Sequence, residues 1–465
     1  MLRIFPPSRF TVSLKAKRRI LLKTSRETFT SRFGLLMTMI GVAVGLGNVW
    51  RFPYMVGEFG GAPFVIFYIF VVGVIGIPAL MAEWTLGRLT RRGPVGAFAR
   101  AGLPYGRAVG WFFFFVVTAA TGYYTNVLGW VLYYAAGGLA DALGLAWESS
   151  EILPPDEGFV ARSFFLQMTC TGLVILACVA VLLKGLRSGI ERVSKFIMPT
   201  LLTMLLILIV RSVTLPGAGA GIQWYLLKVD LSAFTGRVML AALGQAVFSL
   251  SLGGTFMVVY GSYLKRQDHL RSNAVWTVTG DVIAGVLAGF AIFPAVFALG
   301  LEPASGPGLL FETLPQVFGQ IPLGGLFAFL FFLALFGAAY LSDVAAFEVL
   351  VAGLTDNTRL SRTQAVWLMA AVVFLIALPP MINMEIFVPW DLTFGSGMQT
   401  LGALLSVVTV AWVIRRSEAL KALADDDEAP PLWLYYWLRF VIPGAIILVG
   451  LWWVLTDLLG VMGGV

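Results

Sequence analysis

The sequence predicts an all-α polytopic membrane protein. Of its 465 residues, 59% are hydrophobic and only 12% are charged, whereas soluble domains carry about 25% charged residues. The apolar residues fall in long runs, and a bilayer core about 30 Å thick needs about 20 such residues per helix. Two of the runs are interrupted by glycines and polar residues. These observations predict a bundle of about eleven helices, two of them broken, and exclude a soluble enzyme of two or three domains.

The apolar runs set the expected boundaries of the helices. They predict spans over residues 33–57, 64–87, 110–138, 163–183, 193–213, 235–262, 274–300, 322–350, 364–380, 390–414 and 434–457. We expect four parts: a basic cytoplasmic tail at 1–32, a first five-helix repeat at 33–213, a second, inverted repeat at 235–414, and one extra C-terminal helix at 434–457.

The basic residues predict the orientation of the chain. They gather in the tail and in alternate loops, for example at Arg88, Arg91, Lys265 and Arg359, and the remaining loops are mainly acidic. Loops rich in Lys and Arg stay in the cytoplasm. We therefore expect a multi-pass protein of a bacterial inner membrane, with the N-terminus cytoplasmic and the C-terminus extracytoplasmic. The net charge of +7 then requires no nucleic-acid partner, and no obligatory protein partner is evident.

The few residues suited to catalysis exclude several classes of enzyme. The only histidine is His269, so a metal site or a triad that needs several imidazoles is excluded. Cys170 and Cys178 lie in one apolar run and are expected to be core residues without a disulfide.

The first predicted span contains a break. Its segment 41–53 holds glycines at 41, 45 and 47, and each glycine weakens a helix by about 1 kcal/mol relative to alanine. Close helix packing explains glycines, but not the polar Asn48 and the cationic Arg51 in the same span. In lipid, a broken backbone is tolerated only where it is buried in protein or lines a cavity. We therefore expect a binding cavity at this break.

A second break is expected at residues 245–255, where glycines again accompany hydroxyls and an amide. It lies five spans after the first, and an odd offset inverts one half of the chain relative to the other. Inverted repeats with broken helices at the substrate site are typical of secondary transporters.

These residues resemble the sodium:neurotransmitter symporter family, specifically its bacterial amino-acid transporters with eleven helices. The resemblance rests on Gly41–Pro53 with Glu58–Gly61, on Gln245–Gly253, and on Tyr123-Tyr124, Ala288–Phe290 and Glu348-Val349. It covers nearly the whole chain from about Arg26 and implies a symporter that couples an amino acid to sodium.

The resemblance implies a central site for the amino acid. The amides of Leu46 and Gly47 and the Tyr124 hydroxyl would hold the carboxylate, and Phe248 would cover the pocket. The amine would face the carbonyls of Ala43 and Phe248 and the region of Ser251, and the implied set also includes Gly254 and Ser342. Gly254, Ala120 and Ala346 are smaller than their counterparts in leucine-selective relatives, so we expect a bulky apolar or aromatic substrate.

The resemblance also implies two sodium sites. The first would use the Ala43 carbonyl, Asn48, Ser249, Asp281 and the substrate carboxylate, which are hard oxygen ligands. The second would use the carbonyls of Gly41, Val44 and Ala338 and the hydroxyl of Ser342. At this second site Leu341 replaces the usual polar residue and Asp343 follows Ser342. Three roles are open to Asp343: completing the site, facing the substrate amine or binding a proton.

Asp281 stands where chloride-dependent relatives carry an amide, and Gly285 replaces another polar ligand, although Tyr68, Gln245 and Ser249 remain. A fixed carboxylate could supply the charge that chloride supplies elsewhere, so we expect no chloride requirement.

The resemblance implies two gates. Arg51 with Asp391 would close the outer side. Arg26 with Asp356, near Tyr263, would close the inner side.

Three other functions are alternatives. A proton-coupled amino-acid transporter of the same fold is compatible with Leu341 and the two aspartates, and an amino-acid sensor would keep the same site without transport. An intramembrane protease would use Asp281 and Asp343 as a dyad, but the sequence around them does not match protease motifs. We therefore expect a transporter and no enzyme.

Overall fold

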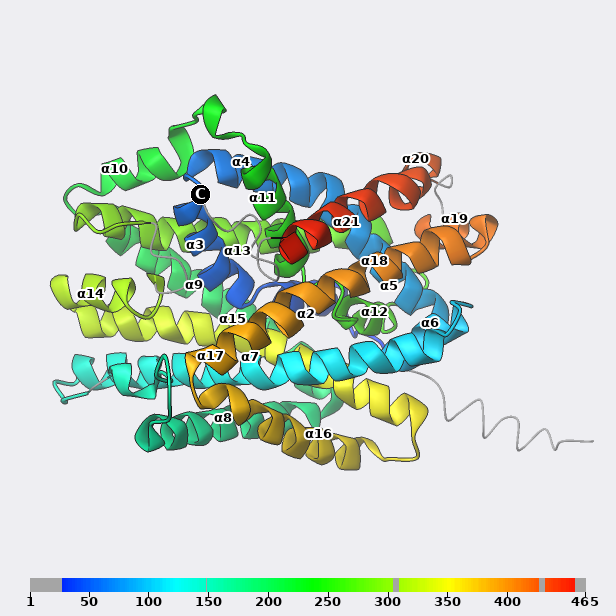
Figure 1. The fold of residues 1–465 in the computed structure, drawn as a ribbon, viewed down its shortest axis with the longest axis horizontal. Helices are drawn as coiled ribbons and strands as arrows, with labels where there is room; N and C mark the ends of the chain where they lie inside the picture. The colour runs from blue at the N-terminus through cyan, green and yellow to red at the C-terminus, as the bar shows by residue number, and fades with distance from the viewer. Residues whose placement is uncertain (1–26, 148, 304–308, 426–430, 456–465) are drawn as a thin grey trace, which may run out of the picture.

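The computed structural model describes residues 27–147, 149–303, 309–425 and 431–455, and this part of the chain is helical without β-strands (Figure 1). Helices satisfy their backbone hydrogen bonds internally, which a bilayer requires. In the first half, the helices are α2 (Arg32–Ala43), α3 (Phe52–Glu58), α4 (Ala62–Val71), α5 (Ile77–Thr90), α6 (Pro94–Arg100), α7 (Gly106–Ala142), α8 (Ala161–Leu182), α9 (Arg192–Val213) and α10 (Ala218–Ile222).

The second half of the chain is also helical. Its helices are α11 (Gly236–Ser249), α12 (Phe256–Gly261), α13 (Leu270–Ala298), α14 (Thr313–Gln320), α15 (Gly324–Asn357), α16 (Arg362–Ala377), α17 (Met384–Trp390), α18 (Met398–Val408), α19 (Arg416–Leu423), α20 (Leu432–Tyr436) and α21 (Ile442–Trp453). Short π-helical turns continue several of them at Gly47–Arg51, Val72–Gly76, Leu186–Glu191, Gln223–Leu227, Asp391–Gly397, Thr409–Val413 and Trp437–Val441.

Ten of the eleven predicted segments correspond to membrane-spanning stretches within the described residues, and not every span is a continuous helix. Within the described residues, nine helical stretches are long and apolar enough to cross a membrane, and the bent pair Arg32–Ala43 and Gly47–Glu58 makes a tenth. The remaining predicted span, 235–262, is divided between α11 and α12, which are each shorter than a bilayer requires.

Both predicted breaks are present. In the first, α2 ends at Ala43, Val44 is extended with φ −71° and ψ 115°, and the helix resumes at Gly47 after a bend of 55°. In the second, Ser251, Gly253 and Thr255 all have positive φ. Gly253 is required there, because a Cβ at this position would overlap the carbonyl oxygen of Gln399 in the first turn of α18.

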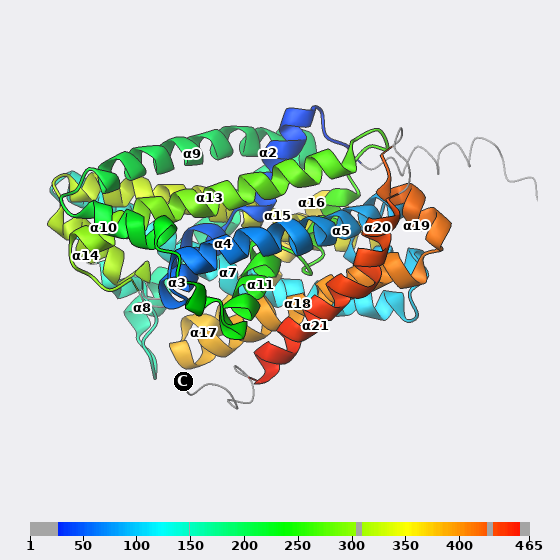
Figure 2. The ribbon, with the colours of Figure 1, turned by 90° about the horizontal axis from the view of Figure 1, so that it is seen from above.

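The broken helices lie inside the bundle. The long helices α7 and α15 pack side by side along one side of them, and α9 and α13 pack together on another (Figures 1 and 2). At the opposite edge, α21 covers α18 and α11 (Figure 2). The two breaks are therefore shielded from lipid by unbroken helices.

Four short helices were not predicted: α6, α10, α14 and α19. They lie between the spans and have only five to eight residues each. Segments of this length are too short to produce a clear periodic pattern of apolar residues.

Candidate substrate and ion site

A pocket lies where the two breaks meet α7, α15 and α18. Its lining residues are Ala43, Gly45, Leu46, Gly47, Ala120, Thr121, Tyr123, Tyr124, Phe248, Ser251, Phe256, Ser342, Ala346 and Gln399. Of the predicted substrate-binding residues, all but Gly254 belong to this set. The ring of Phe256 fills the space in which a Cβ of Gly254 would lie, so Gly254 does not itself widen the pocket.

The polar end of the pocket is formed by the first break. The Leu46 N–H donates to the Tyr124 hydroxyl over 3.3 Å. A Cβ on Gly45 would come within 2.6 Å of the Ser342 hydroxyl and 2.8 Å of the Tyr124 hydroxyl, so only glycine leaves the backbone accessible here. Backbone amides at a helix break favour a negatively charged group such as a carboxylate.

Beside this pocket, Asp281 lies in a fully buried cluster. The Asn48 amide nitrogen lies 2.8 Å from Asp281 Oδ1 and 3.1 Å from Ser249 Oγ. The hydroxyls of Ser249 and Tyr68 lie 2.9 Å and 3.3 Å from Asp281 Oδ2. Three of the predicted ligands of the first sodium site thus come together from the two breaks and α13, and Ala43 lines the adjacent pocket. This oxygen-rich, negatively charged cluster suits an alkali cation.

At the predicted second sodium site, one hydroxyl lies among backbone carbonyl oxygens. The Ser342 hydroxyl lies 3.4, 3.2 and 3.1 Å from the carbonyl oxygens of Gly41, Val42 and Val44. Ala338 is buried one turn earlier on α15, and Leu341 packs against Gly41, where a Cβ would lie 2.7 Å from it. The carbonyls of the first break therefore converge on Ser342, and Leu341 contributes only apolar contact.

Asp343 points in another direction. Its carboxylate accepts hydrogen bonds from the Thr125 hydroxyl of α7 over 3.0 and 3.2 Å, and the Cys178 thiol of α8 lies 3.5 Å away. A carboxylate that points to α7 and α8 is directed away from the second sodium site and from the substrate amine. Two of the three roles that the sequence left open are therefore not supported by its direction. Two adjacent residues of α15 point to different helices because successive helical residues are about 100° apart.

Two further polar residues support the breaks. The Glu83 carboxylate of α5 accepts a hydrogen bond from the Gly253 N–H over 2.8 Å, and the Gln245 amide donates to the Gly47 carbonyl over 2.8 Å. Glu83 was missed by the sequence reasoning. Its position in an apolar span could have identified it, because an acidic side chain in a membrane has a high free-energy cost and is typically functional.

Arg51, which was predicted for the outer gate, lies against Phe248 of the pocket lining. Its guanidinium carbon lies 4.3 Å from the centre of the Phe248 ring, a distance typical of a cation–π contact. Asp391 accepts a hydrogen bond from Tyr123 and interacts electrostatically with Arg51. The Phe311 ring contacts Trp50 and Trp130, with centroids 6.0 Å apart in both pairs.

The predicted inner gate is partly described. Arg26 lies outside the described residues, and Asp356 accepts a hydrogen bond from the Gly93 N–H over 2.5 Å. Tyr263 donates to the buried Glu348, which forms a two-point ion pair with Arg362 at 2.6 and 3.1 Å. The sequence reasoning did not identify this ion pair.

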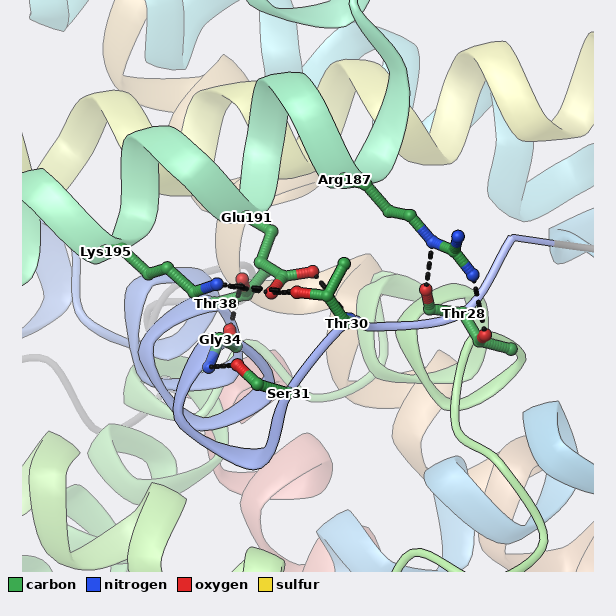
Figure 3. A network of polar contacts seen from close by, with 8 residues as sticks. All are labelled: Thr28, Thr30, Ser31, Gly34, Thr38, Arg187, Glu191 and Lys195. Atoms are coloured by element: carbon green, nitrogen blue, oxygen red, sulfur yellow. Dashed lines mark hydrogen bonds and ion pairs between the residues drawn. The ribbon is translucent and has the colours of Figure 1, made fainter.

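The segment that precedes α2 is packed against the turn Leu186–Glu191 and the start of α9, so the last residues of the expected tail are part of the folded structure (Figure 3). The Thr30 N–H donates to the buried Glu191 over 2.9 Å, and the Lys195 ammonium pairs with the same carboxylate at 2.7 Å. Arg187 donates to the Thr28 carbonyl over 2.8 Å. Gly34 makes room for this contact, because any Cβ would overlap the Glu191 carboxylate.

Comparisons with known proteins identify the family of this chain. The model of the sodium:neurotransmitter symporter family matches residues 26–156 and 161–458. An uncharacterized sodium-dependent transporter of Haemophilus influenzae is 33% identical over 91% of this chain and 97% of its own length. The uncharacterized sodium-dependent transporter YhdH of Bacillus subtilis is 33% identical over 90% and 96%.

The fold is also found in a solved structure. The crystal structure of MhsT in complex with L-phenylalanine matches with a TM-score of 0.78 and 34% identity, over 92% of this chain and 99% of that one. This chain therefore belongs to the sodium:neurotransmitter symporter family and is a sodium-dependent membrane transporter.

Proposed function

We propose that this transporter imports a bulky apolar or aromatic amino acid together with sodium, by alternating access and without a requirement for chloride. The observation that carries this proposal is the Asp281 cluster. Its fixed carboxylate lies with Asn48, Ser249 and Tyr68 within 3.3 Å, next to the pocket lined by Leu46 and Gly47. An ion there and a substrate carboxylate beside it would attract each other, so each raises the affinity of the other by the same factor.

The absence of a chloride requirement follows from charge. The carboxylate of Asp281 supplies one negative charge beside the first ion, and Gly285 lies close by, where a Cβ would be 3.8 Å from the Asn48 amide nitrogen. A chloride ion added next to Asp281 would be repelled by this carboxylate, because like charges in a buried site interact strongly.

We assign the second sodium ion to the carbonyls of Gly41, Val44 and Ala338 with the Ser342 hydroxyl. Only one side-chain oxygen supports this site, because Leu341 is apolar. We therefore expect weaker sodium binding here than at the site that contains Asp281.

The substrate class is supported by the pocket lining. Beyond the polar end, Ala120 and Ala346 leave space between the rings of Tyr123, Phe248 and Phe256, and aromatic rings pack well against apolar and aromatic side chains. The related MhsT was crystallised with L-phenylalanine, which is an amino acid of this class.

We place the protein in a bacterial inner membrane with its N-terminus in the cytoplasm. The distribution of Lys and Arg supports this orientation. Arg51 and Asp391 would then close the outer side, and Arg26, Asp356 and Tyr263 the inner side.

Uptake by proteoliposomes tests the proposal. Labelled phenylalanine, leucine and alanine are supplied with sodium or choline, with chloride or gluconate, and at two pH values. We expect uptake that requires sodium, is unchanged in gluconate, and favours phenylalanine or leucine over alanine. Uptake driven by a proton gradient in choline would instead support the proton-coupled alternative, and saturable binding without uptake would support a sensor.

A further inference from the structure

One polar side chain in the lining of the central pocket has no part in the roles assigned so far. Gln399 lies in the first turn of α18 and is half-buried. Two glycines bring this turn against the second break. A Cβ on Gly253 would lie 1.7 Å from the Gln399 carbonyl oxygen, and one on Gly402 would lie 1.8 Å from the Gly253 carbonyl oxygen. This close approach of the two backbones places the Gln399 side chain at the pocket.

Gln399 lines a different part of the pocket from the backbone amides of the first break. Its carboxamide oxygen lies 3.4 Å from the position that a Cβ of Gly254 would take, and the Phe256 ring lies 2.2 Å from the same position. The polar end of the pocket, around Gly45 and Tyr124, is formed by the first break and α7. A substrate whose carboxylate lies at the polar end would direct its side chain toward Phe256 and Gln399.

The contact that the Gln399 carboxamide makes fixes its orientation. Its nitrogen lies 3.4 Å from the Phe394 carbonyl oxygen in the π-helical turn Asp391–Gly397. The reverse orientation would place two acceptor oxygens against each other, because a carboxamide has donors only on its nitrogen. The oxygen is therefore the atom that faces Gly254, and within the described residues it accepts no hydrogen bond.

The hydroxyls that line the pocket already have partners. The Thr121 hydroxyl donates to the Val117 carbonyl over 2.7 Å, and the Ser251 hydroxyl donates to the Val42 carbonyl over 2.9 Å. The remaining hydroxyls of the lining take part in the contacts at the first break and at the outer gate. Among the described side chains of the lining, the Gln399 carboxamide oxygen is thus the polar atom that is left for a substrate.

We propose that Gln399 is a specificity-determining residue, whose carboxamide oxygen accepts a hydrogen bond from the far edge of the substrate's side chain. This inference rests on the function proposed above and narrows the preferred substrate to an aromatic amino acid with a donor on its ring, the phenol O–H of tyrosine or the indole N–H of tryptophan. Such side chains have an apolar body and a polar tip, so the body would pack against Phe256 while the tip reaches Gln399. Phenylalanine and leucine would leave the oxygen without a donor.

The expected size of the preference follows from the exposure of Gln399. A site that fully buries such an acceptor rejects analogues that lack the donor by several orders of magnitude. Gln399 is only half-buried, and an unpaired acceptor costs less where it is partly exposed. We therefore expect tyrosine to be preferred over phenylalanine by about three- to tenfold, the effect of one ordinary hydrogen bond.

Inhibition of sodium-dependent uptake of labelled leucine by proteoliposomes tests the proposal. Tyrosine should inhibit the unmodified protein at a concentration about three- to tenfold lower than phenylalanine. Tryptophan should show the same advantage over 1-methyltryptophan, which lacks the N–H. Gln399→Met keeps the length of the side chain without the carboxamide and should remove both preferences.

Two further variants separate the hydrogen bond from general effects. Gln399→Glu keeps an acceptor oxygen and should retain both preferences. Leu401→Ala changes a side chain of α18 that is 47% exposed and should also retain them. Each preference is a ratio measured on one protein, so it does not depend on how much of a variant folds.

The outcomes distinguish this inference from the function on which it rests. Equal inhibition by tyrosine and phenylalanine in the unmodified protein would overturn the inference and leave sodium-coupled uptake in place. A preference for tyrosine that is unchanged in Gln399→Met would also overturn it, because another group would then recognise the ring donor. If leucine, phenylalanine and tyrosine all lack sodium-dependent uptake, the proposed function fails, and the inference fails with it.

Discussion

Asp281 and Asp343 are both fully buried within the bundle, yet they lie in different surroundings. Asp281 is contacted by Asn48 and Ser249 at the two breaks and by Tyr68 of α4. Asp343 is contacted by Thr125 and Cys178, which belong to the unbroken helices α7 and α8. A carboxylate beside broken helices can exchange its partners for an ion, whereas one between unbroken helices has fixed partners. We therefore expect Asp281 to act in ion coupling and Asp343 to act mainly in packing.

The largest expected effect is that of Asp281→Asn. Removing the charge should weaken sodium binding by about 2–3 kcal/mol, on the order of 100-fold, as for hydrogen bonds to charged groups. A chloride requirement should appear, because the site then lacks its fixed negative charge. Sodium titrations of uptake in chloride and in gluconate measure both effects, with Asp281→Glu as the control that keeps the charge. Unchanged sodium affinity would contradict the proposed role.

Glu348 is a third buried acid, and it differs from both aspartates in having a cationic partner. Arg362→Gln should lower the free energy of unfolding by about 2 kcal/mol, because it leaves the buried Glu348 without its cationic partner. This value is below the usual cost of breaking a buried ion pair, since the Arg362 side chain is 34% exposed. The measurement is the fraction of substrate binding that survives heating in detergent. The double variant Arg362→Gln with Glu348→Gln should recover part of the loss. If it does not, the ion pair is not the cause.

Ser249→Ala tests the donors around Asp281 without changing its charge. The loss of one hydroxyl should weaken sodium binding by about 1 kcal/mol, roughly fivefold. Sodium-dependent substrate binding measures it. Ser406→Ala is a suitable comparison, since Ser406 is also buried but lies on α18, and it should leave the sodium affinity unchanged.

The smallest effect is expected for Asp343→Asn. Asparagine keeps the size of the side chain and an oxygen that can accept from Thr125, so thermal stability should change by less than about 1 kcal/mol. The sodium dependence of uptake should be unchanged. A loss of sodium coupling comparable with that of Asp281→Asn would remove the distinction between the two aspartates.

The sequence was sufficient for much of the fold. Hydrophobicity predicted the spans, and the glycines with Asn48 predicted the first break. Both predictions rest on the high free-energy cost of backbone groups that are exposed to lipid without a hydrogen bond. The short helices α6, α10, α14 and α19 could not be predicted in this way. The break in the second repeat was predicted over 245–255, and the helix in fact continues to Ser249, because local propensity places helix ends only to within a few residues.

The site was predictable only where a motif fixed the neighbours. Asn48, Ser249 and Asp281 were expected together through the resemblance, and they do meet. No sequence pattern joined Glu191 to Thr30, which are 161 positions apart, or Glu83 to Gly253. These contacts depend on which helices pack together.

The sequence by itself therefore determined that lipid surrounds the chain, where the spans lie, that two of them are broken, and to which family the protein belongs. The tertiary structure decided the surroundings of each buried charge: Asp343 turns to α7 and α8, and Phe256 occupies the space beside Gly254. The physical reason is that helical periodicity fixes the face on which a residue lies. The helix that meets this face is determined by the packing of the whole bundle.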